Sequence, residues 1–276
     1  MVNADDFGLS EGINRGILSA FHEGILRSAS LMPNGAAFTD AVSLARNNPD
    51  LGVGIHLSLV DERCVANAEA VRGLADKDSM LPGSYTSFVK GYFLKNFGIS
   101  QIRAEMEAQV QKFLETGLKP THIDSHQHLH IMPGIFEAVL EIAEKSDIRV
   151  VRVPLERGGV FPRSFDMRGA SLIFLNALCG RASRKARASG FLVADHFWGL
   201  DASGRMNEEN LVRALNSLRP GVNEIMCHPG FSDAASRQRY PWGYQWDEEA
   251  AALKSESVRK IISDNNVRLA SFREIQ

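Results

Sequence analysis

The sequence has few cysteines, no long apolar run and no excess of charge of one sign. Its three cysteines, Cys64, Cys179 and Cys227, lie far apart and form no CxxC pair. This spacing argues against a disulfide-stapled fold and favours a reducing compartment. No apolar run reaches the roughly 18 residues of a membrane-spanning helix. The opening residues MVNADDFG resemble neither a signal peptide nor a transit peptide, so we expect a cytoplasmic protein without an integral membrane segment.

The balance of charge argues against nucleic acid as a partner. The net charge is −2 at pH 7, so the sequence carries no basic excess of the kind that nucleic-acid-binding chains use, and we expect no nucleic-acid partner. Basic residues do gather between Arg181 and Arg187, which we interpret as a solvated helix face. With 276 residues, 44% of them hydrophobic, the chain can bury a large core, and intrinsic disorder is excluded.

Short apolar segments alternate with amphipathic ones along most of the chain. The segments predicted as strands are Met1–Ala4, Ser28–Met32, Leu51–Leu57, Thr121–Ser125, Ile148–Val153, Gly190–Ala194, Asn223–Cys227 and Val267–Ala270. The segments between them have helical periodicity, and Ser10 and Asn207 are placed to cap two of these helices. Such alternation predicts an α/β fold with a parallel sheet.

We expect seven to eight strand–helix units forming a distorted, TIM-like (β/α) barrel, in a single domain over residues 1–276. An open, doubly wound sheet is the alternative. Residues 61–98 carry few signals and are predicted to be an irregular lid or a local insertion.

The polar residues of greatest chemical interest come at or just after the predicted strands. They are Asp5, Asp6, His56, His126, Arg152 and His228. In a barrel these strand ends share one rim, where active sites are built, so residues distant in sequence are expected to meet there.

The segment from residue 122 to residue 130 is rich in histidine. His122, Asp124, His126, His128 and His130 follow one another at every second position, so an extended chain would place them on one face. Neutral imidazole is a common ligand of divalent metals, and we expect at least one of these histidines, but not all of them, to bind metal. The alternative is a row of polar rim residues.

Four further residues suit acid–base or metal chemistry. If a turn directs Asp5 and Asp6 into one cavity, one carboxylate can hold a metal while the other accepts a proton; the alternative is a turn residue beside a helix terminus. His228 precedes Pro229-Gly230 and is placed to be an exposed proton donor. Arg152 ends a buried strand and therefore requires a carboxylate or an anionic ligand.

Two other histidine positions remain open. His56 lies in an apolar strand, where a satisfied core histidine is the competing interpretation. His196 and Trp198 follow another strand and could form an aromatic platform for a sugar, or could pack in the core.

Four motifs, kept in order between residues 2 and 273, resemble the YdjC-like carbohydrate deacetylases. They are Val2-Asn3-Ala4-Asp5-Asp6-Phe7-Gly8-Leu9-Ser10, Gly54-Ile55-His56-Leu57, Pro120-Thr121-His122-Ile123-Asp124-Ser125-His126-Gln127-His128-Leu129-His130 and Met226-Cys227-His228-Pro229-Gly230. The resemblance implies a distorted β/α barrel that removes acetyl groups from N-acetylated sugars with a divalent metal. The expected first strand is shorter than is usual for this family.

Carried over motif by motif, the resemblance assigns roles to individual residues. It implies that Asp6, His56 and His126 hold the metal, that Asp5 is the base and that His228 is the acid. Arg152-Val153-Pro154 is similar to the Arg-x-Pro motif that orients the base in the wider polysaccharide deacetylase superfamily. We further expect His128 and His130 to contact sugar hydroxyls.

The expected activity is therefore hydrolysis of a linear amide C–N bond in an N-acetylated amino sugar, either an oligosaccharide or a glycolipid. The cofactor is one divalent ion: the His₂Asp set suits Zn, whereas the resemblance suggests Mg, and it also suggests a homodimer. A two-metal phosphohydrolase and a non-catalytic sugar-binding protein are the rival interpretations, and one or two ions in the site would separate the first two.

Overall fold

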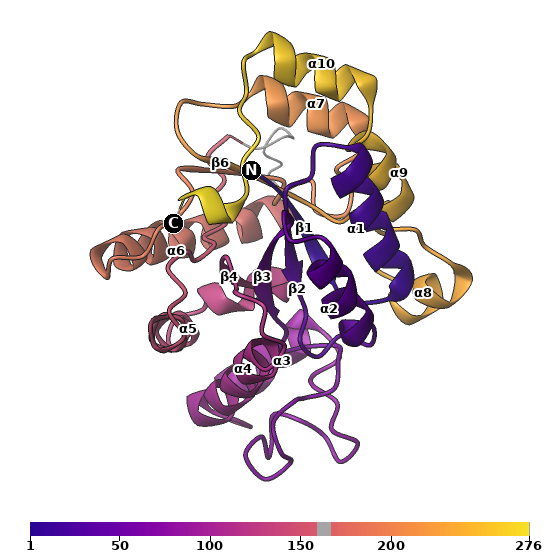
Figure 1. The fold of residues 1–276 in the computed structure, drawn as a ribbon. Helices are drawn as coiled ribbons and strands as arrows, with labels where there is room; N and C mark the ends of the chain where they lie inside the picture. The colour runs from indigo at the N-terminus through magenta and orange to yellow at the C-terminus, as the bar shows by residue number, and fades with distance from the viewer. Residues whose placement is uncertain (159–166, 276) are drawn as a thin grey trace.

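The computed structural model describes residues 1–158 and 167–275, and its centre is one curled sheet of parallel strands (Figure 1). The six strands are β1 (Val2–Phe7), β2 (Ser28–Leu31), β3 (Gly52–Leu57), β4 (Ile123–Ser125), β5 (His196–Trp198) and β6 (Asn223–Cys227). Their order across the sheet is β4-β3-β2-β1-β6-β5, and all pairs are parallel. The predicted α/β class is confirmed, and the curled sheet forms half of a barrel.

The predicted number of strands is wrong: the described residues form six, not seven to eight. Residues 148–153 and 190–194 extend the curl past β4 only through single parallel bridges, Ile123 with Val151 and Val150 with Leu192. Residues 267–270 form no strand, and the fifth strand lies at His196–Trp198, beyond the predicted apolar segment. An apolar run shows that a segment is buried, but a strand also needs a neighbour along several residues.

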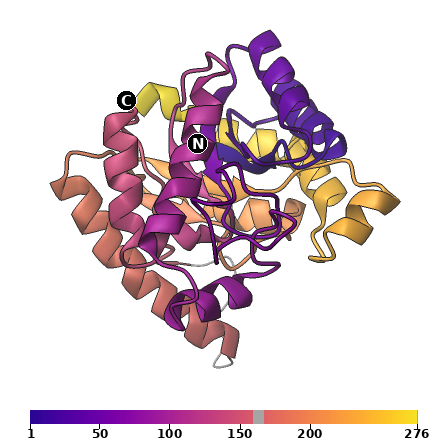
Figure 2. The same ribbon diagram turned by 90° about the horizontal axis from the view of Figure 1, so that it is seen from below.

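Helices surround the sheet. They are α1 (Glu11–Glu23), α2 (Phe38–Asn47), α3 (Tyr85–Phe93), α4 (Ile99–Leu114), α5 (Ile135–Lys145), α6 (Met167–Ala188), α7 (Glu208–Asn216), α8 (Ala234–Arg239), α9 (Trp246–Ala252) and α10 (Glu256–Asp264). The indigo helices α1 and α2 lie on the opposite side of the sheet from α4, α5 and α6, and a view turned by 90° shows the same separation (Figure 2).

Local sequence signals fix several of the helix starts. The side chain of Ser10 accepts a hydrogen bond from the Ile13 amide, and that of Asn207 accepts one from the Asn210 amide, so both predicted N-caps are confirmed. The segment of helical periodicity that precedes residues 267–270 forms two short helices, α9 and α10.

Residues 61–98 are mostly irregular, as predicted, but they include helix α3. The buried carboxylate of Glu105 on α4 accepts hydrogen bonds from the Val65 amide at 2.9 Å and the Ala66 amide at 3.0 Å. Gln109, one turn later, donates to the carbonyl of Ser58 at 2.6 Å. Through these bonds, helix α4 holds the first residues of the insertion close to the sheet.

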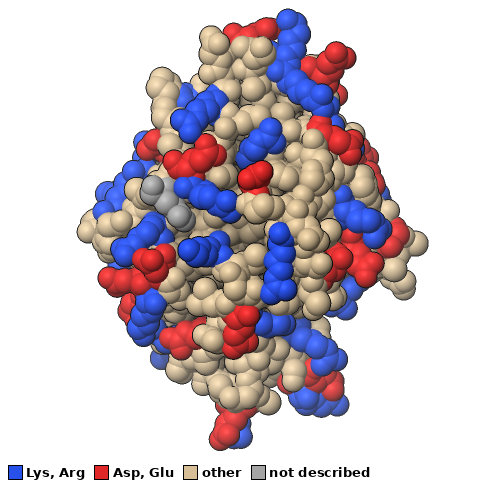
Figure 3. Space-filling view, viewed as in Figure 1, with Lys and Arg blue, Asp and Glu red and all other residues tan. Residues whose placement is uncertain are grey.

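The molecular surface carries side chains of both charges. Lys and Arg side chains are interspersed with Asp and Glu across the face shown in Figure 3, without a broad area of one sign. Among the described residues, no helix combines the length and the apolar character needed to cross a bilayer.

Candidate metal centre

Two adjacent carboxylates at the end of β1 face the same interior. Neighbouring side chains of a regular strand point to opposite faces. Here the register with β2 shifts between Ala4 and Phe7, and Asp6 adopts a left-handed backbone with φ 65°. Oxygens of both Asp5 and Asp6 consequently lie within 4.8 Å of a ring nitrogen of His56. The shift in register therefore acts as the turn that we expected to direct Asp5 and Asp6 to the same cavity.

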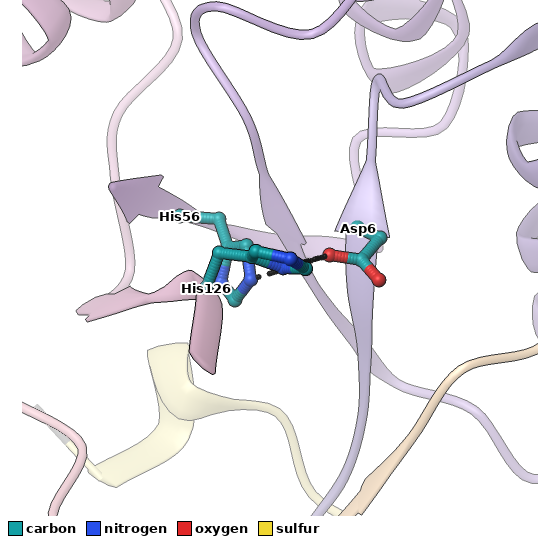
Figure 4. A group of neighbouring side chains, drawn as sticks. All are labelled: Asp6, His56 and His126. Atoms are coloured by element: carbon teal, nitrogen blue, oxygen red, sulfur yellow. Dashed lines mark hydrogen bonds and ion pairs between the residues drawn. The ribbon is translucent and has the colours of Figure 1, made fainter. Parts of the chain in front are cut away.

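Asp6, His56 and His126 converge from three different elements (Figure 4). Asp6 comes from β1, His56 from β3 and His126 from the first residue of the 3₁₀ helix η1 (His126–Ile131). Asp6 Oδ1 lies 2.8 Å from His126 Nδ1 and 3.5 Å from His56 Nε2. The ligand atoms of the three residues all lie within 4.8 Å of one another, and all three side chains are buried.

Two unsatisfied atoms mark this cluster as a site that can hold a cation. Asp6 Oδ2 and His56 Nε2 are buried and have no hydrogen-bond partner in the part of the chain that the structure describes. An unpaired buried polar atom costs about 1–3 kcal/mol, which a bound ion would offset. Asp124 Oδ1 lies 2.7 Å from His56 Nδ1 and fixes the ring with Nε2 directed at Asp6, the usual carboxylate–histidine support of a metal ligand. One carboxylate and two imidazoles form a donor set that fits a divalent metal.

The electrostatics of the cluster also favour positive charge. Burial disfavours the charged form of His56, but the carboxylates of Asp124 and Asp5 outweigh burial and raise the pKa of this histidine to about 10. Burial also acts to raise the pKa of Asp6, yet the charge of His126 and the hydrogen bond from its ring hold that pKa well below its ordinary value. A cation in such a site displaces the protons that otherwise neutralise it.

Arg152 lies beneath the cluster and contacts three carboxylates. Its Nη1 and Nη2 donate to Asp5 at 2.7 and 2.8 Å, its Nη1 also lies 2.7 Å from Asp124, and its Nε donates to Glu224 at 2.6 Å. Burial acts to raise the pKa of Asp124, but the guanidinium outweighs it and the pKa is lowered. The predicted need of Arg152 for a carboxylate is confirmed, and its paired bonds fix the orientation of Asp5.

His228 lies immediately after β6, on the same rim. Its backbone amide donates to the buried carboxylate of Glu249 on α9, and its ring centroid is 4.7 Å from that of Tyr244. The prediction that this imidazole is exposed is wrong: the side chain is buried, and its Nδ1 has no hydrogen-bond partner among the described residues. The charge of His228 contributes to the lowered pKa of Asp6, so the two side chains lie within electrostatic reach of each other.

The predicted row of histidines does not keep one face. After Ser125 the chain leaves the strand for η1, and Gln127 and His128 adopt positive φ values of 54° and 55°. Backbone in this region is uncommon for residues other than glycine, and it turns successive side chains to different sides. His126 reaches the cluster, whereas His122 and His130 point into the core.

His122 and His130 have both ring nitrogens engaged. His122 contacts the hydroxyls of Ser30 and Thr121, each at 2.9 Å. His130 lies 2.6 Å from the Ser125 hydroxyl and 3.0 Å from the Arg152 carbonyl oxygen. Burial lowers the pKa of His122 to about 3 and that of His130 to about 4, so both rings stay neutral. Their hydrogen bonds leave neither ring a free nitrogen for a ligand.

His128 differs from these two. Its Nδ1 has no hydrogen-bond partner, and its ring lies edge-on to Phe197, with 6.2 Å between centroids. Burial lowers the pKa of His128 well below its ordinary value, so this ring is neutral and can donate or accept a hydrogen bond.

Sequence reasoning did not single out the aromatic residues beside the cluster. The ring centroid of Trp242 lies 5.0 Å from that of His126. Trp198, one half of the expected aromatic platform, is buried and donates from Nε1 to Asn223, and His196 contacts the Pro220 carbonyl oxygen. The signal for Trp242 was the dense run Tyr240-Pro241-Trp242-Gly243-Tyr244, which follows no helical or strand period.

Comparison with known proteins finds one family and several relatives that match this chain over nearly its whole length. The profile of the family described as YdjC-like protein matches residues 1–264. Proteins named carbohydrate deacetylase from Brevibacillus brevis and Clostridium beijerinckii are 32% and 30% identical, and each alignment covers 100% of this chain and 98% or 99% of the relative. A crystal structure from Enterococcus faecalis, described as that of a candidate cellobiose-phosphate cleavage protein, superposes with a TM-score of 0.77 over 100% of this chain and 97% of that one, at 23% identity. This last similarity concerns the fold alone.

Proposed function

Because the chain belongs to the YdjC-like protein family, as its four motifs predicted, we propose that it is a divalent-metal-dependent carbohydrate deacetylase. Its substrate would be an N-acetylated amino sugar in an oligosaccharide or a glycolipid. The observation that carries the proposal is the convergence of Asp6, His56 and His126, with Asp5 and His228 on the same rim. The name shared by the relatives confirms the predicted enzyme class, a hydrolase of amide bonds.

Asp6, His56 and His126 would hold the ion. When bound, a divalent ion lowers the pKa of a water ligand and polarises a carbonyl oxygen, which is the chemistry that amide hydrolysis requires. Asp5 would accept the proton of the attacking water. The paired bonds from Arg152, at 2.7 and 2.8 Å, keep Asp5 directed into the cavity.

His228 would donate a proton to the departing amine. An amine leaves poorly unless it is protonated, so hydrolysis needs an acid as well as a base. The buried Nδ1 of His228 has no partner among residues 1–158 and 167–275, which fits a ring poised for a ligand. The bond from its backbone to Glu249 fixes its position. Of the two histidines expected to contact sugar hydroxyls, His128 fits that role better, because both nitrogens of His130 contact the protein.

The rival interpretation with two metals has one observation behind it. Asp5, His56 and Asp124 form a second group of possible ligands within 4.8 Å. However, Arg152 Nη1 already lies 2.7 Å from an oxygen of Asp5 and of Asp124, and a guanidinium supplies the positive charge that a second ion would bring. This arrangement favours a single ion and therefore the deacetylase over the phosphohydrolase.

The ion itself, the homodimer and the cytoplasmic location stay predictions. The donor set of one carboxylate and two imidazoles suits Zn, and family resemblance favours Mg. Metal content of the purified protein, measured after dialysis against each ion, would decide between them, with one ion per chain expected.

The decisive experiment replaces His126 by alanine. We expect His126→Ala to lose both the metal and the release of acetate from N-acetylglucosamine oligomers, because it removes a ligand and the partner of Asp6. His22→Ala removes an exposed histidine of α1 and is the matched control, with activity and metal unchanged. Acetate release at the control rate by His126→Ala would refute the assignment.

A further inference from the structure

A cavity of about 430 Å³ lies beside the metal cluster and has no role in the mechanism above. Four segments form its walls: the start of the insertion, the two residues before α3, η1, and the end of α8 with the residues that follow it. The lining includes Asp61, Ser84, Gln127, Arg239, Tyr240 and Trp242.

This cavity and the cluster share a wall. The ring of Trp242 lies 5.0 Å from that of His126, centroid to centroid, and Gln127 Nε2 lies 3.4 Å from His126 Nε2. The amide of Gln127 also reaches Asp61 Oδ2 at 3.4 Å. A molecule bound in the cavity would therefore lie next to a ligand bound at Asp6, His56 and His126.

The two sides of the cavity differ in chemistry. One side is the indole of Trp242, whose ring centroid lies 4.8 Å from that of Tyr240 and 5.4 Å from that of Tyr244. The other side carries polar groups, among them the half-buried carboxylate of Asp61 and Gln127 Oε1, which is buried without a partner. A pyranose ring presents an apolar face and a rim of hydroxyls, so it matches an aromatic wall opposite hydrogen-bonding groups.

The one cation of the lining is already paired. Glu62 accepts a hydrogen bond from Arg239 Nη2 at 2.8 Å and another from the Tyr240 hydroxyl at 2.7 Å. These bonds tie the insertion to the segment after α8 and hold the aromatic wall in place. Because Glu62 balances the guanidinium, the cavity favours a neutral ligand over an anionic one.

We propose that this cavity binds the sugar ring next to the acetylated one, and that Trp242 is the residue that determines specificity for substrates with a second ring. The inference rests on the proposed function and adds to it a preference for oligosaccharides over the free monosaccharide.

The test compares Trp242→Ala with wild type on the monomer and the dimer of N-acetylglucosamine. We expect KM for the dimer to rise by about five- to tenfold, the size of one lost aromatic contact, while kcat for the dimer and KM for the monomer stay unchanged. Metal content should also be unchanged. Phe93→Ala removes an exposed aromatic side chain of α3, 72% exposed, and serves as the control. An equal change in KM for both sugars, or none for the dimer, would overturn the proposal.

A second measurement needs no turnover. Titration of the metal-loaded protein with the dimer should change the tryptophan fluorescence, and Trp242→Phe should remove most of that change; an identical titration in the variant contradicts the subsite. If wild type releases no acetate yet binds the dimer through Trp242, the proposed function fails and the subsite stands. If acetate is released and Trp242→Ala treats both sugars as wild type does, the function stands and the subsite fails.

Discussion

His122 stays neutral inside the folded chain, and its hydrogen bonds show which ring nitrogen carries the proton. The Ser30 hydroxyl donates its proton to Asp124 at 2.7 Å, so it can only accept from His122 Nε2. The opposite nitrogen, Nδ1, then accepts from the Thr121 hydroxyl. A second proton on this ring would oppose one of these bonds, and burial already lowers the pKa of His122 to about 3.

This residue makes stability depend on pH. The unfolded chain takes up a proton at His122 near its ordinary pKa of 6.5, whereas the folded chain does so only near 3. As the pH falls from 6.5 towards 3, His122 therefore removes about 1.4 kcal/mol from the free energy of unfolding for each pH unit. In His122→Asn, the plot of that free energy against pH should be flatter by this amount, measured by urea denaturation between pH 6.5 and 4.5.

Other groups also titrate across this range, and the comparison of slopes removes them. Burial raises the pKa of Glu224 to about 7, which acts in the opposite direction as the pH falls, but it does so in both proteins. His22→Asn, on the exposed face of α1, should keep the wild-type slope. Parallel plots for His122→Asn and wild type would show that His122 is protonated in the folded state.

For individual residues, the sequence predicts which type of partner a buried charge needs, but it does not predict which residue that partner is. The charge of Arg152 at the end of a buried segment predicts a carboxylate partner. Its three actual partners, Asp5, Asp124 and Glu224, come from three strands, and only the folded sheet brings them together. Pairings of this kind depend on strand order, which no local pattern encodes.

Strand β3 approaches the start of β4 so closely that only glycine fits at Gly54. A Cβ atom there would lie 2.3 Å from Nδ1 and Cε1 of His122, closer than real Cβ contacts come. We expect Gly54→Ala to lower the free energy of unfolding by about 1–3 kcal/mol, the usual range for overpacking. Chemical denaturation would measure this loss.

Gly180→Ala is the matched control for that substitution. A Cβ atom at Gly180 in α6 would meet its nearest neighbour, Arg184 Nη1, at 4.0 Å. Alanine is the better helix former, so this variant should be neutral or slightly more stable. If Gly54→Ala proved as stable as Gly180→Ala, the close approach of β3 to His122 would be wrong.

Among the elements, apolar runs located β2, β3, β4 and β6 within one or two residues. They failed at residues 148–153 and 190–194, which are buried in part but make only single bridges. Burial and strand pairing produce the same apolar pattern, and the pattern alone does not separate them.

For the molecule as a whole, one buried carboxylate, that of Glu105, anchors the first part of the insertion at residues 61–98. Glu105 accepts bonds from the Val65 and Ala66 amides, and Glu105→Ala would leave both donors unpaired. We expect a protease to cut this variant within 61–98 several times faster than wild type, while the free energy of unfolding falls by only about 1–3 kcal/mol. Mass spectrometry of the fragments from limited proteolysis would locate the cuts.

Glu107→Ala is the control, because Glu107 is an exposed neighbour on the same helix. It should be cut at the wild-type rate. First cuts in the strands or in α1 of Glu105→Ala, rather than in the insertion, would show that the carboxylate supports the core instead.

The barrel-like arrangement and the rim of polar residues could be expected from the alternation of strands and helices. The contact between the insertion and the residues after α8, made by Glu62 with Arg239 and Tyr240, could not. These partners are separated by most of the chain, and neither segment has a regular period from which a neighbour could be inferred.

The left-handed backbone of Asp6 has a consequence for laboratory evolution. Glycine takes φ 65° without strain, and at this position it would also remove a buried negative charge. Libraries selected only for survival of heating would thus enrich glycine at position 6, and the most heat-tolerant clones would have lost one of the proposed ligands of the ion. Selection for thermal tolerance in this chain therefore has to be coupled to a screen for turnover.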